Sequence, residues 1–250
     1  MYKAIIFDLD GTAIPNRKDG MPSSRLIGVI SKIKNEVAVS VATGRPIFNC
    51  REILKSLGVV SPCIIAGGAQ IIDPQSETVL WQKFIAKKSV QQVIDAVNQF
   101  DYQIYFSNEV KSSKAREKLM NKPENIIYIM AVSKRHASIL LKKFKKITDI
   151  VSHSVPSWTP DHFDIHITHK EATKKYALEL LLKMIKVKKN ETVGFGDGDN
   201  DLPIFEIVGY KVAMENGSDR LKKIADEIAF SAEKDGVARV IERLFSSRIL

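Results

Sequence analysis

The sequence predicts an α/β fold in which a core of parallel strands is interrupted by an inserted α+β lobe. Short apolar runs alternate with segments of helical spacing at the start of the chain, and the same alternation returns near its end. Short apolar runs suit strands that are buried on both faces of a parallel sheet. The stretch between these two parts has a different pattern, and 250 residues suffice for a sizeable core.

The first part of the chain reads as strand, helix, strand, helix and strand. The strand-like runs are residues 4–7, 37–42 and 62–66, and residues 23–33 have helical spacing. Pro46 is expected to begin the second helix, where its missing N–H costs no hydrogen bond. This alternation is typical of a parallel sheet covered by helices.

The middle of the chain supplies helices and strands of its own. A hairpin is expected around Asp73-Pro74, and helices over residues 89–100 and 135–144. Strand-like runs lie at residues 102–106, 126–132, 149–153 and 163–168. This set is sufficient for a separate α+β lobe.

The last part returns to the alternating pattern. Residues 171–186 form an amphipathic helical pattern, and residues 192–195 form a strand-like run that leads into Gly196-Asp197-Gly198-Asp199-Asn200-Asp201. Short strands are expected near Val212 and Ile228, each followed by a helix.

These three parts set the expected domain boundaries. We expect residues 1–82 and 169–250 to form one core, and residues 83–168 to form the inserted lobe.

The composition is typical of a soluble globular protein, with a net charge of +9. Basic runs at residues 142–146 and 183–189 alternate with apolar residues, so we interpret them as solvated helix faces and expect no nucleic-acid partner. Cys50 and Cys63 lie in apolar stretches without a CxxC pattern, which indicates buried thiols in a reducing compartment. No signal peptide or membrane-spanning run is recognisable, and we expect a cytoplasmic protein without a membrane partner.

Three predicted strand ends carry unusual polar residues. They are Asp8-Leu9-Asp10-Gly11-Thr12, Thr43-Gly44-Arg45 and Asp197-Gly198-Asp199-Asn200-Asp201. Ligands of parallel α/β sheets bind beyond the carboxyl ends of the strands, so neighbouring strands would bring these carboxylates into one crevice. Like charges raise one another's pKa, and a divalent cation with oxygen ligands, Mg²⁺ or Ca²⁺, resolves the repulsion. An EF-hand is excluded, because Leu202 and Val208 replace its Gly and Glu.

This set of side chains suits phosphoryl transfer. A carboxylate can attack phosphorus to form an acyl phosphate, and a second acid can protonate the leaving oxygen and then activate water. Gly11 supplies the turn that lets Asp8 and Asp10 act together. The hydroxyls of Thr12 and Thr43 suit phosphoryl oxygens, and a lysine would neutralise the developing charge.

The same motifs resemble those of the haloacid dehalogenase-like phosphatases. Asp8-Leu9-Asp10-Gly11-Thr12 resembles the DxDGT motif, Thr43-Gly44-Arg45 the second motif, and residues 196–201 the GDxxND motif. Residues 212–217 and 235–238 resemble two further family segments, and the long insert is similar to the large α/β cap of the Cof-type branch. The resemblance covers nearly the whole chain and implies a Rossmann-like core with an inserted cap.

The resemblance also implies a role for each matching position. Asp8 would be the nucleophile and a Mg²⁺ ligand, and Asp10 the general acid/base with its backbone carbonyl on the metal. The expected phosphate- and substrate-binding residues are Thr12, Thr43, Gly44, Arg45 and Asn200, with Arg45 alternatively paired to a helix carboxylate. Asp197 would bind the metal directly, and Asp201 would hold a metal-bound water.

The third family motif is a lysine at the start of the helix that follows the cap. Lys174 fits its spacing, but Lys175 stands where the family usually has Gly, and Lys170 and Lys175 remain rivals. Thr168 and Glu171 also have the spacing of a capping box, which would start the helix earlier and turn Lys174 away.

We therefore expect a Mg²⁺-dependent hydrolase of a small phosphorylated metabolite, a sugar phosphate or a phosphoglycolate-like ester, acting through a phosphoaspartate. The alternatives are a phosphosugar mutase of the same fold, a non-catalytic nucleic-acid or anion-binding protein, and a dehalogenase or phosphonatase. The intact acids argue against a non-catalytic binder, and the carboxylates of residues 196–201, with the need for Mg²⁺, argue against a dehalogenase. The histidines lack metal-ligand spacing. Structural roles are expected for His162 and Asp164, with a position facing the substrate from the cap as the alternative, and packing in the core or cap is expected for Trp158.

Overall fold

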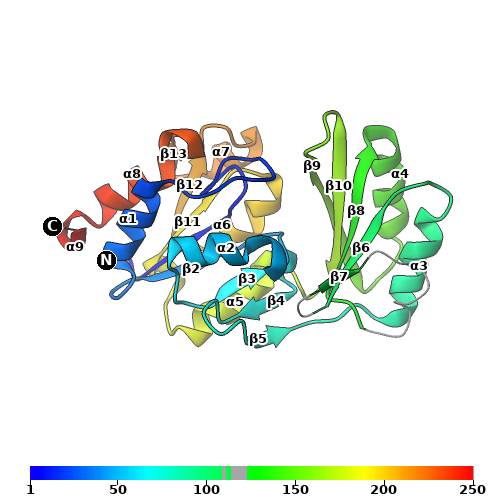
Figure 1. The fold of residues 1–250 in the computed structure, drawn as a ribbon, viewed down its shortest axis with the longest axis horizontal. Helices are drawn as coiled ribbons and strands as arrows, with labels where there is room; N and C mark the ends of the chain where they lie inside the picture. Colours follow the sequence, from blue (N-terminus) through cyan, green and yellow to red (C-terminus); the bar gives the residue numbers. More distant parts are fainter. Residues whose placement is uncertain (109–110, 114–122, 250) are drawn as a thin grey trace.

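A computed structural model describes residues 1–108, 111–113 and 123–249. It shows two lobes side by side, which we call the core lobe and the cap, and both chain ends lie at the side of the core lobe remote from the cap (Figure 1). The chain passes between the lobes twice, after β5 (Val79–Gln82) and after β10 (His162–His169). The predicted α/β class with an inserted lobe is confirmed. The predicted boundaries at residues 82/83 and 168/169 remain predictions.

The core lobe is built on a parallel sheet with strand order β13-β12-β11-β1-β2. Its strands are β1 (Ala4–Phe7), β2 (Ala38–Val41), β11 (Thr192–Gly196), β12 (Tyr210–Met214) and β13 (Glu227–Ala229). β1 lies between β11 and β2, with Phe7 opposite both Phe195 and Val41. This register brings the ends of the three strands, and the three polar motifs that follow them, to the same edge of the sheet.

Helices cover both faces of this sheet. They are α1 (Ser24–Ile33), α2 (Ile47–Leu57) and α8 (Gly236–Leu244) on one face, and α5 (Lys174–Met184), α6 (Leu202–Phe205) and α7 (Asp219–Ile224) on the other; α9 (Ser246–Ile249) ends the described chain. Ile5 and Phe7 pack against the first group, while Ala4 and Ile6 pack against the second. The apolar run of β1 is buried on both sides because successive strand residues point to opposite faces.

The third strand differs from the expectation. β3 (Cys63–Ile65) belongs to a three-stranded antiparallel sheet with β4 (Gln70–Ile72) and β5, and touches the main sheet by one parallel bridge between Ala42 and Ile64. The chain reverses directly after β3, so the backbone of β3 pairs with β4 instead of extending the parallel sheet. The expected hairpin around Asp73 joins β4 to β5.

The cap is an antiparallel sheet covered by two helices on one face. Its strands, in the order β7-β6-β8-β10-β9, are β6 (Ile104–Asn108), β7 (Lys111–Ser113), β8 (Ile126–Ser133), β9 (Ile150–Pro156) and β10. The helices are α3 (Lys87–Val97) and α4 (Lys134–Phe144). Val93 and Leu140 of these helices pack on Ile127 and Ile165 of the sheet. The opposite face of the sheet is left to meet the core lobe.

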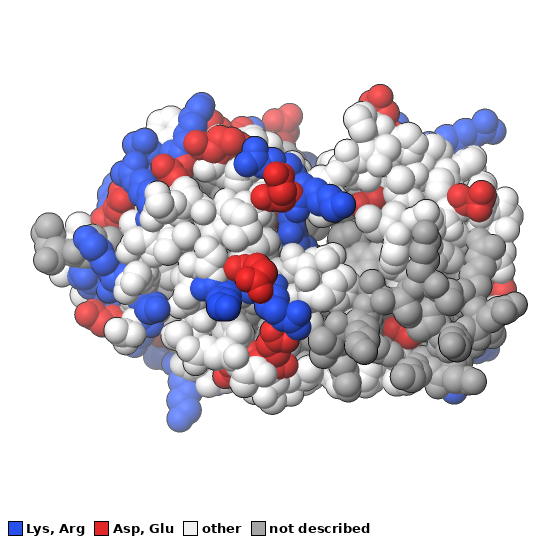
Figure 2. Space-filling view, in the orientation of Figure 1, with Lys and Arg blue, Asp and Glu red and all other residues white. Residues whose placement is uncertain are grey.

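One face of the surface and the burial of the two thiols can be compared with the expectations. Lys and Arg side chains are interspersed with Asp and Glu on the face drawn in Figure 2, rather than gathered into one basic patch. Cys50 and Cys63 are buried and unpaired. None of the helices in the described chain combines the length and apolarity that a bilayer crossing requires.

Candidate active site

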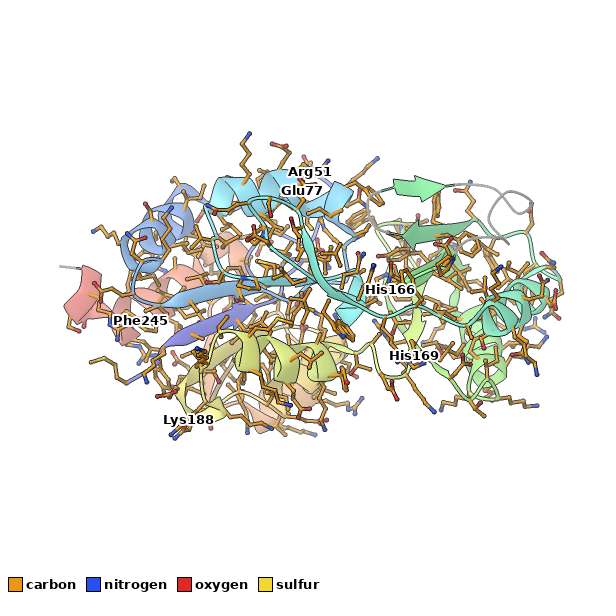
Figure 3. All side chains as sticks on the ribbon, turned by 90° about the horizontal axis from the view of Figure 1, so that it is seen from below. Arg51, Glu77, His166, His169, Lys188 and Phe245 are labelled. Carbon is orange, nitrogen blue, oxygen red and sulfur yellow. The ribbon has the colours of Figure 1, made fainter. Side chains whose placement is uncertain are left out.

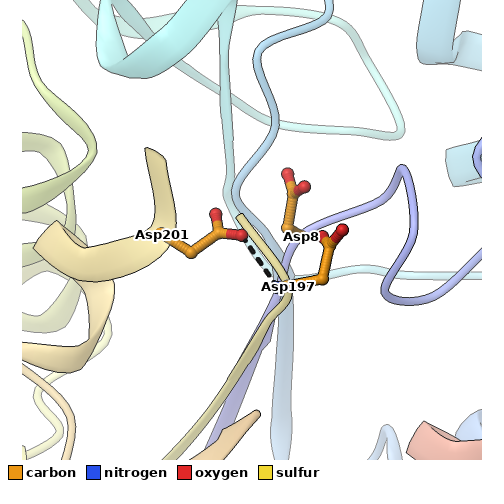
Figure 4. A group of neighbouring side chains, drawn as sticks. All are labelled: Asp8, Asp197 and Asp201. Carbon is orange, nitrogen blue, oxygen red and sulfur yellow. Dashed lines mark hydrogen bonds between the residues drawn. The ribbon is translucent and has the colours of Figure 1, made fainter. Parts of the chain in front are cut away.

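Three carboxylates converge at the carboxyl edge of the main sheet. Asp8 follows β1, and Asp197 and Asp201 follow the neighbouring strand β11. Each offers one oxygen to a group whose atoms lie within 4.8 Å of one another (Figure 4). Asp201 is held by its own loop, because its Oδ2 accepts the backbone N–H groups of Asp197 and Gly198, each at 3.1 Å.

Lys174 lies against two of these carboxylates. Its Nζ donates to Asp8 Oδ1 at 2.9 Å and to Asp201 Oδ1 at 2.7 Å, and its side chain is 4% exposed. Among the candidate lysines, Lys175 instead pairs with Glu206 on the surface, and Lys170 is exposed.

The start of α5 sets the direction of Lys174. The helix begins after Thr173, whose hydroxyl accepts the backbone N–H of Tyr176 at 3.2 Å. The alternative capping box is wrong, because Thr168 is part of β10 and the Glu171 side chain accepts from Lys83. Gly68 has φ +105°, and a Cβ there would lie 2.3 Å from the Thr173 carbonyl carbon. A glycine at this position therefore allows the backbone of the helix start to approach.

The carboxylates outnumber the cation beside them. Burial and then repulsion from Asp201 raise the pKa of Asp197 to about 7. Burial raises the pKa of Asp8 well above its ordinary value, against the attraction of Lys174. Burial opposes the charge on Lys174, yet Asp201 and Asp8 raise the pKa of this ammonium. One lysine facing three acids leaves a net negative site of oxygen ligands, which fits a divalent cation.

The turn after Asp8 positions Asp197. Gly11 has φ +77°, and a Cβ at this position would lie 2.3 Å from Asp197 Oδ2. The Thr12 hydroxyl donates to Asp197 Oδ1 at 2.9 Å, so in this structure Thr12 orients an acid, whereas a phosphate contact was expected. Asn216 was not singled out in the sequence; its amide donates to the Gly11 carbonyl at 2.9 Å and joins the segment after β12 to this turn.

Asp10 lies outside the group of three acids and is paired with Arg45. The Arg45 Nε and one terminal nitrogen donate to the two Asp10 oxygens at 2.8 and 2.5 Å. The expected alternative, a helix carboxylate, is wrong, because Asp10 belongs to the loop after β1. The guanidinium also lies 5.4 Å from the ring centre of Trp158 in the cap. Arg45 thus joins the second acid to the cap.

The remaining motif residues line or support the space above the acids. The Thr43 hydroxyl accepts the backbone N–H of Arg45 at 3.1 Å, and the Gly44 carbonyl accepts the Tyr128 hydroxyl of the cap at 2.9 Å. Asn200 lies on the wall of the same space.

A cleft of about 920 Å³ lies between the core lobe and the cap. Asp8, Asp10, Arg45, Asp197 and Asn200 line it from the core lobe, and Tyr105, Tyr128, Met130, Trp158, Asp164 and His166 line it from the cap. Figure 3 shows His166 at the boundary between the lobes. Trp158 and Asp164 both line the cleft, so Trp158 is not simply packed in the interior of the cap, and Asp164 has the cleft-facing position that was the alternative for it. His162 is not among the described lining residues, and its Nδ1 lies 2.7 Å from the Pro160 carbonyl.

Two cap histidines stand over the site without forming a metal site. His153 and His166 are paired across β9 and β10 with ring centres 5.4 Å apart. The grouping that could hold a metal, within the part of the chain that the structure describes, contains only aspartates. Burial, and then the charge of Lys174, lowers the pKa of His153 from 6.5 to about 4.

His153→Gln should reduce the decrease in the free energy of unfolding that occurs when the pH is lowered to 5. The folded chain keeps His153 neutral, while the unfolded chain takes up a proton near pH 6.5, so this residue's contribution is complete above pH 6.5 and falls as the pH approaches 4. Urea unfolding at pH 7.5, 6 and 5 measures the effect. The variant should lose less unfolding free energy than the native chain over this range, with His162→Gln as the control. An equal loss in the native chain and in His153→Gln would refute the assignment.

The chain is similar to known proteins over nearly its whole length. The sequence model of a family described as haloacid dehalogenase-like hydrolase matches residues 5–241. The chain is 25% identical to a phosphoglycolate phosphatase of Staphylothermus marinus, over 98% of each chain. It is 24% identical to the 5-amino-6-(5-phospho-D-ribitylamino)uracil phosphatase YitU of Bacillus subtilis, over 97% of each. A solved haloacid dehalogenase-like hydrolase from B. subtilis has the same fold, with a TM-score of 0.84, 20% identity, and coverage of 97% of this chain and 100% of that one.

Proposed function

The chain belongs to the haloacid dehalogenase-like hydrolases, and from this premise we propose that it is a Mg²⁺-dependent phosphomonoesterase that acts through a phosphoaspartate on Asp8. Its relatives of matching length include proteins named as phosphatases. The observation that carries the proposal is the placement of Lys174 between Asp8 and Asp201, at 2.9 and 2.7 Å, while Asp10 stands apart as a second acid.

The aspartate group is the proposed metal site. Asp8 and Asp197 would hold Mg²⁺ directly with the Asp10 backbone carbonyl, and Asp201 would act through a water. The fit rests on three oxygens within 4.8 Å of one another and on the excess of negative charge. Mg²⁺ also prefers a few carboxylates together with waters and substrate phosphate. When bound, the ion would supply charge neutralisation for the phosphoryl group.

The proposed reaction has two displacements at phosphorus. An Asp8 oxygen attacks phosphorus, the bond to the ester oxygen breaks, and Asp10 gives its proton to the leaving alcohol. Asp10 then takes a proton from a water that attacks the same phosphorus, which releases inorganic phosphate and restores the Asp8 carboxylate. Both Asp10 oxygens accept a hydrogen bond from Arg45 in this structure, and each oxygen keeps a second lone pair for proton transfer.

Other residues would bind and orient the phosphoryl group. Lys174 offers positive charge beside the attacking oxygen, and Thr43 and Asn200 are the proposed contacts to the phosphoryl oxygens. The substrate class that we propose is a small phosphorylated metabolite. The two relatives named above carry names that differ in the leaving group, one a two-carbon acid and the other a ribitylamino-uracil.

Removal of divalent cations should abolish phosphate release. We expect release of inorganic phosphate from p-nitrophenyl phosphate to fall at least about a hundredfold after treatment with EDTA, and to return with Mg²⁺, because three clustered acids would otherwise face the substrate with one lysine. Undiminished hydrolysis in EDTA would contradict the metal proposal. An absence of phosphate release from a broad panel of phosphomonoesters with Mg²⁺ present would contradict the phosphatase proposal itself.

A further inference from the structure

The face of the cap sheet that is turned away from α3 and α4 and toward the core lobe carries a row of rings. Tyr105, Tyr128, His166 and His153 lie directly opposite one another across β6, β8, β10 and β9. The ring centres are 4.9 Å apart for Tyr128 and His166 and 5.4 Å apart for His166 and His153. The Nδ1 atom of His166 is enclosed, and no hydrogen-bond partner for it exists among the residues that the structure describes. The row thus forms an aromatic surface that faces the acids, and it includes one ring nitrogen without a hydrogen-bond partner.

The outer part of the cleft adds further flat and apolar surface. Met130 and Trp158 line it beyond the row, and Trp158 is 46% exposed although it lies over Arg45. At about 920 Å³ the cleft is at the upper end of the range for sites that hold drug-sized ligands. A two-carbon leaving group would leave most of this surface without a contact, whereas a flat ring matches it.

One carboxylate in this surface lies beside a strained bulge. The register of β10 against β8 shifts between Phe163 and Ile165, and Ala131 on β8 has φ +51°. The Ala131 N–H donates to Asp164 Oδ1 at 2.8 Å, and Asp164 is 7% exposed. Bulges and strained non-glycine residues concentrate beside functional sites, where they redirect a side chain. Here the extra residue lies on β8, while β10 keeps its regular pairing with β9, so Asp164 lies on the same face as His166 and lines the cleft.

The charges of the lining select against an anionic leaving group. Among the described cap residues that line the cleft, Asp164 is the one with an acidic side chain; burial raises the pKa of its carboxyl group, and in its charged form a carboxylate only accepts hydrogen bonds. The one cation among the described lining residues is Arg45, which is already bound to both oxygens of Asp10. A carboxylate or second phosphate on the leaving group would therefore face Asp164 without a free cation.

We propose that the cap recognises a leaving group built on a flat ring that carries an N–H or O–H donor, with Trp158 and Tyr105 against the ring and Asp164 accepting from the donor. This inference rests on the proposed phosphatase function. It narrows the substrate to ring-bearing, uncharged leaving groups and disfavours phosphoglycolate-like esters.

Two series of matched esters test the contribution of the ring and that of the N–H donor separately. One series is uridine 5′-phosphate, 3-methyluridine 5′-phosphate and ribose 5-phosphate; the other is riboflavin 5′-phosphate, its N3-methyl derivative and ribitol 5-phosphate. In at least one series we expect kcat/KM about tenfold higher for the ring-bearing ester than for the ring-free one. Methylation of N3 should lower kcat/KM about tenfold, since a hydrogen bond to a buried charged group is lost.

Two variants assign the effects to residues. Trp158→Leu should lower the ratio of ring-bearing to ring-free kcat/KM about fivefold or more. Asp164→Asn keeps an oxygen for the Ala131 N–H but offers an amide donor to the cleft, and should erase the preference for N3–H over N3-methyl. Phe230→Leu, which replaces an exposed ring on the core lobe, is the matched control and should change neither ratio.

The outcomes distinguish the two proposals. Hydrolysis of the ring-free esters at rates equal to or above those of the ring-bearing ones in both series would overturn the ring inference and leave the phosphatase proposal intact. The same holds if ring preference persists unchanged in both Trp158→Leu and Asp164→Asn. Hydrolysis of none of the six esters, nor of p-nitrophenyl phosphate, would overturn the phosphatase proposal and the inference that rests on it.

Discussion

Asp8→Asn is expected to lower phosphate release from p-nitrophenyl phosphate by about 10⁴-fold or more while the chain stays folded. An amide cannot form the acyl phosphate, and removal of a covalent nucleophile typically costs this much. The substitution changes little in shape, so the cleft and the bond between Lys174 and Asp201 at 2.7 Å should persist. Steady-state kinetics with Mg²⁺ measures the loss in kcat.

The same variant should be at least as stable as the native chain in metal-free buffer. Burial raises the pKa of Asp8, so the folded chain holds this proton more tightly than the unfolded chain, and the residue's contribution to stability decreases as the pH rises. At neutral pH an uncharged amide removes this cost. Urea unfolding at pH 7.5 with EDTA should therefore give an unchanged or larger free energy of unfolding.

The control for Asp8→Asn is Asp95→Asn, an identical chemical change at an exposed position on α3. This variant should keep native kinetics. Residual turnover in Asp8→Asn within about tenfold of native would contradict nucleophilic attack by Asp8, and unfolding of the variant would contradict the electrostatic argument.

The parts of the site that the sequence predicts are those that depend on local chain order. Asp8, Asp197 and Asp201 each follow a short apolar strand, and adjacent parallel strands must end at the same edge of a sheet. The start of α5 was ambiguous, because two cap signals precede Lys174 within a few residues. The contact of Gly68 with the backbone of Thr173 could not resolve this from the sequence, because a glycine does not show which element approaches it.

The cap surface could not be predicted in the same way. The row from Tyr105 to His153 exists only because four strands pair in one register, and its members are spread along the sequence between residues 105 and 166. Asp164 lies on the same face of β10 as His166, and an extra residue in β8 brings the Ala131 N–H against it, which the sequence pattern does not show. The pairing of Arg45 with Asp10 likewise joins two loops that are 35 residues apart in sequence.

The prediction that the third strand extends the parallel sheet was wrong for a related reason. An apolar run that ends in glycines fits both a parallel strand and the first strand of an antiparallel hairpin, and periodicity does not distinguish them. The pairing of β3 with β4 is decided by the immediate reversal of the chain. This error left the site intact, because Thr43 N still donates to Ile64 O at 2.9 Å and the second motif stays at the sheet edge.

Lys174→Met is the second change from which we expect a large effect, a loss of about 10³-fold in kcat. The ammonium is the described cation that contacts Asp8, and it would stabilise negative charge on the attacking and phosphoryl oxygens. Without it the pKa of Asp8 should rise further, since the attraction of Lys174 opposes the effect of burial in the native chain. A larger share of Asp8 would then be protonated and unable to attack.

Stability should respond to Lys174→Met in a pH-dependent way that a simple packing defect would not produce. Removing one partner of a buried ion pair typically costs about 3–5 kcal/mol, and here Asp8 and Asp201 would both lose their cation. Protonation of Asp8 relieves the cost at low pH. The free energy of unfolding should therefore fall more steeply than in the native chain as the pH rises from 5.5 to 8 in EDTA. Lys175→Met removes the neighbouring lysine, which pairs with Glu206 on the surface, and should leave both kcat and this slope close to native. Equal losses in the two variants, or a Lys174→Met chain with native kcat, would show that Lys174 does not serve the reaction.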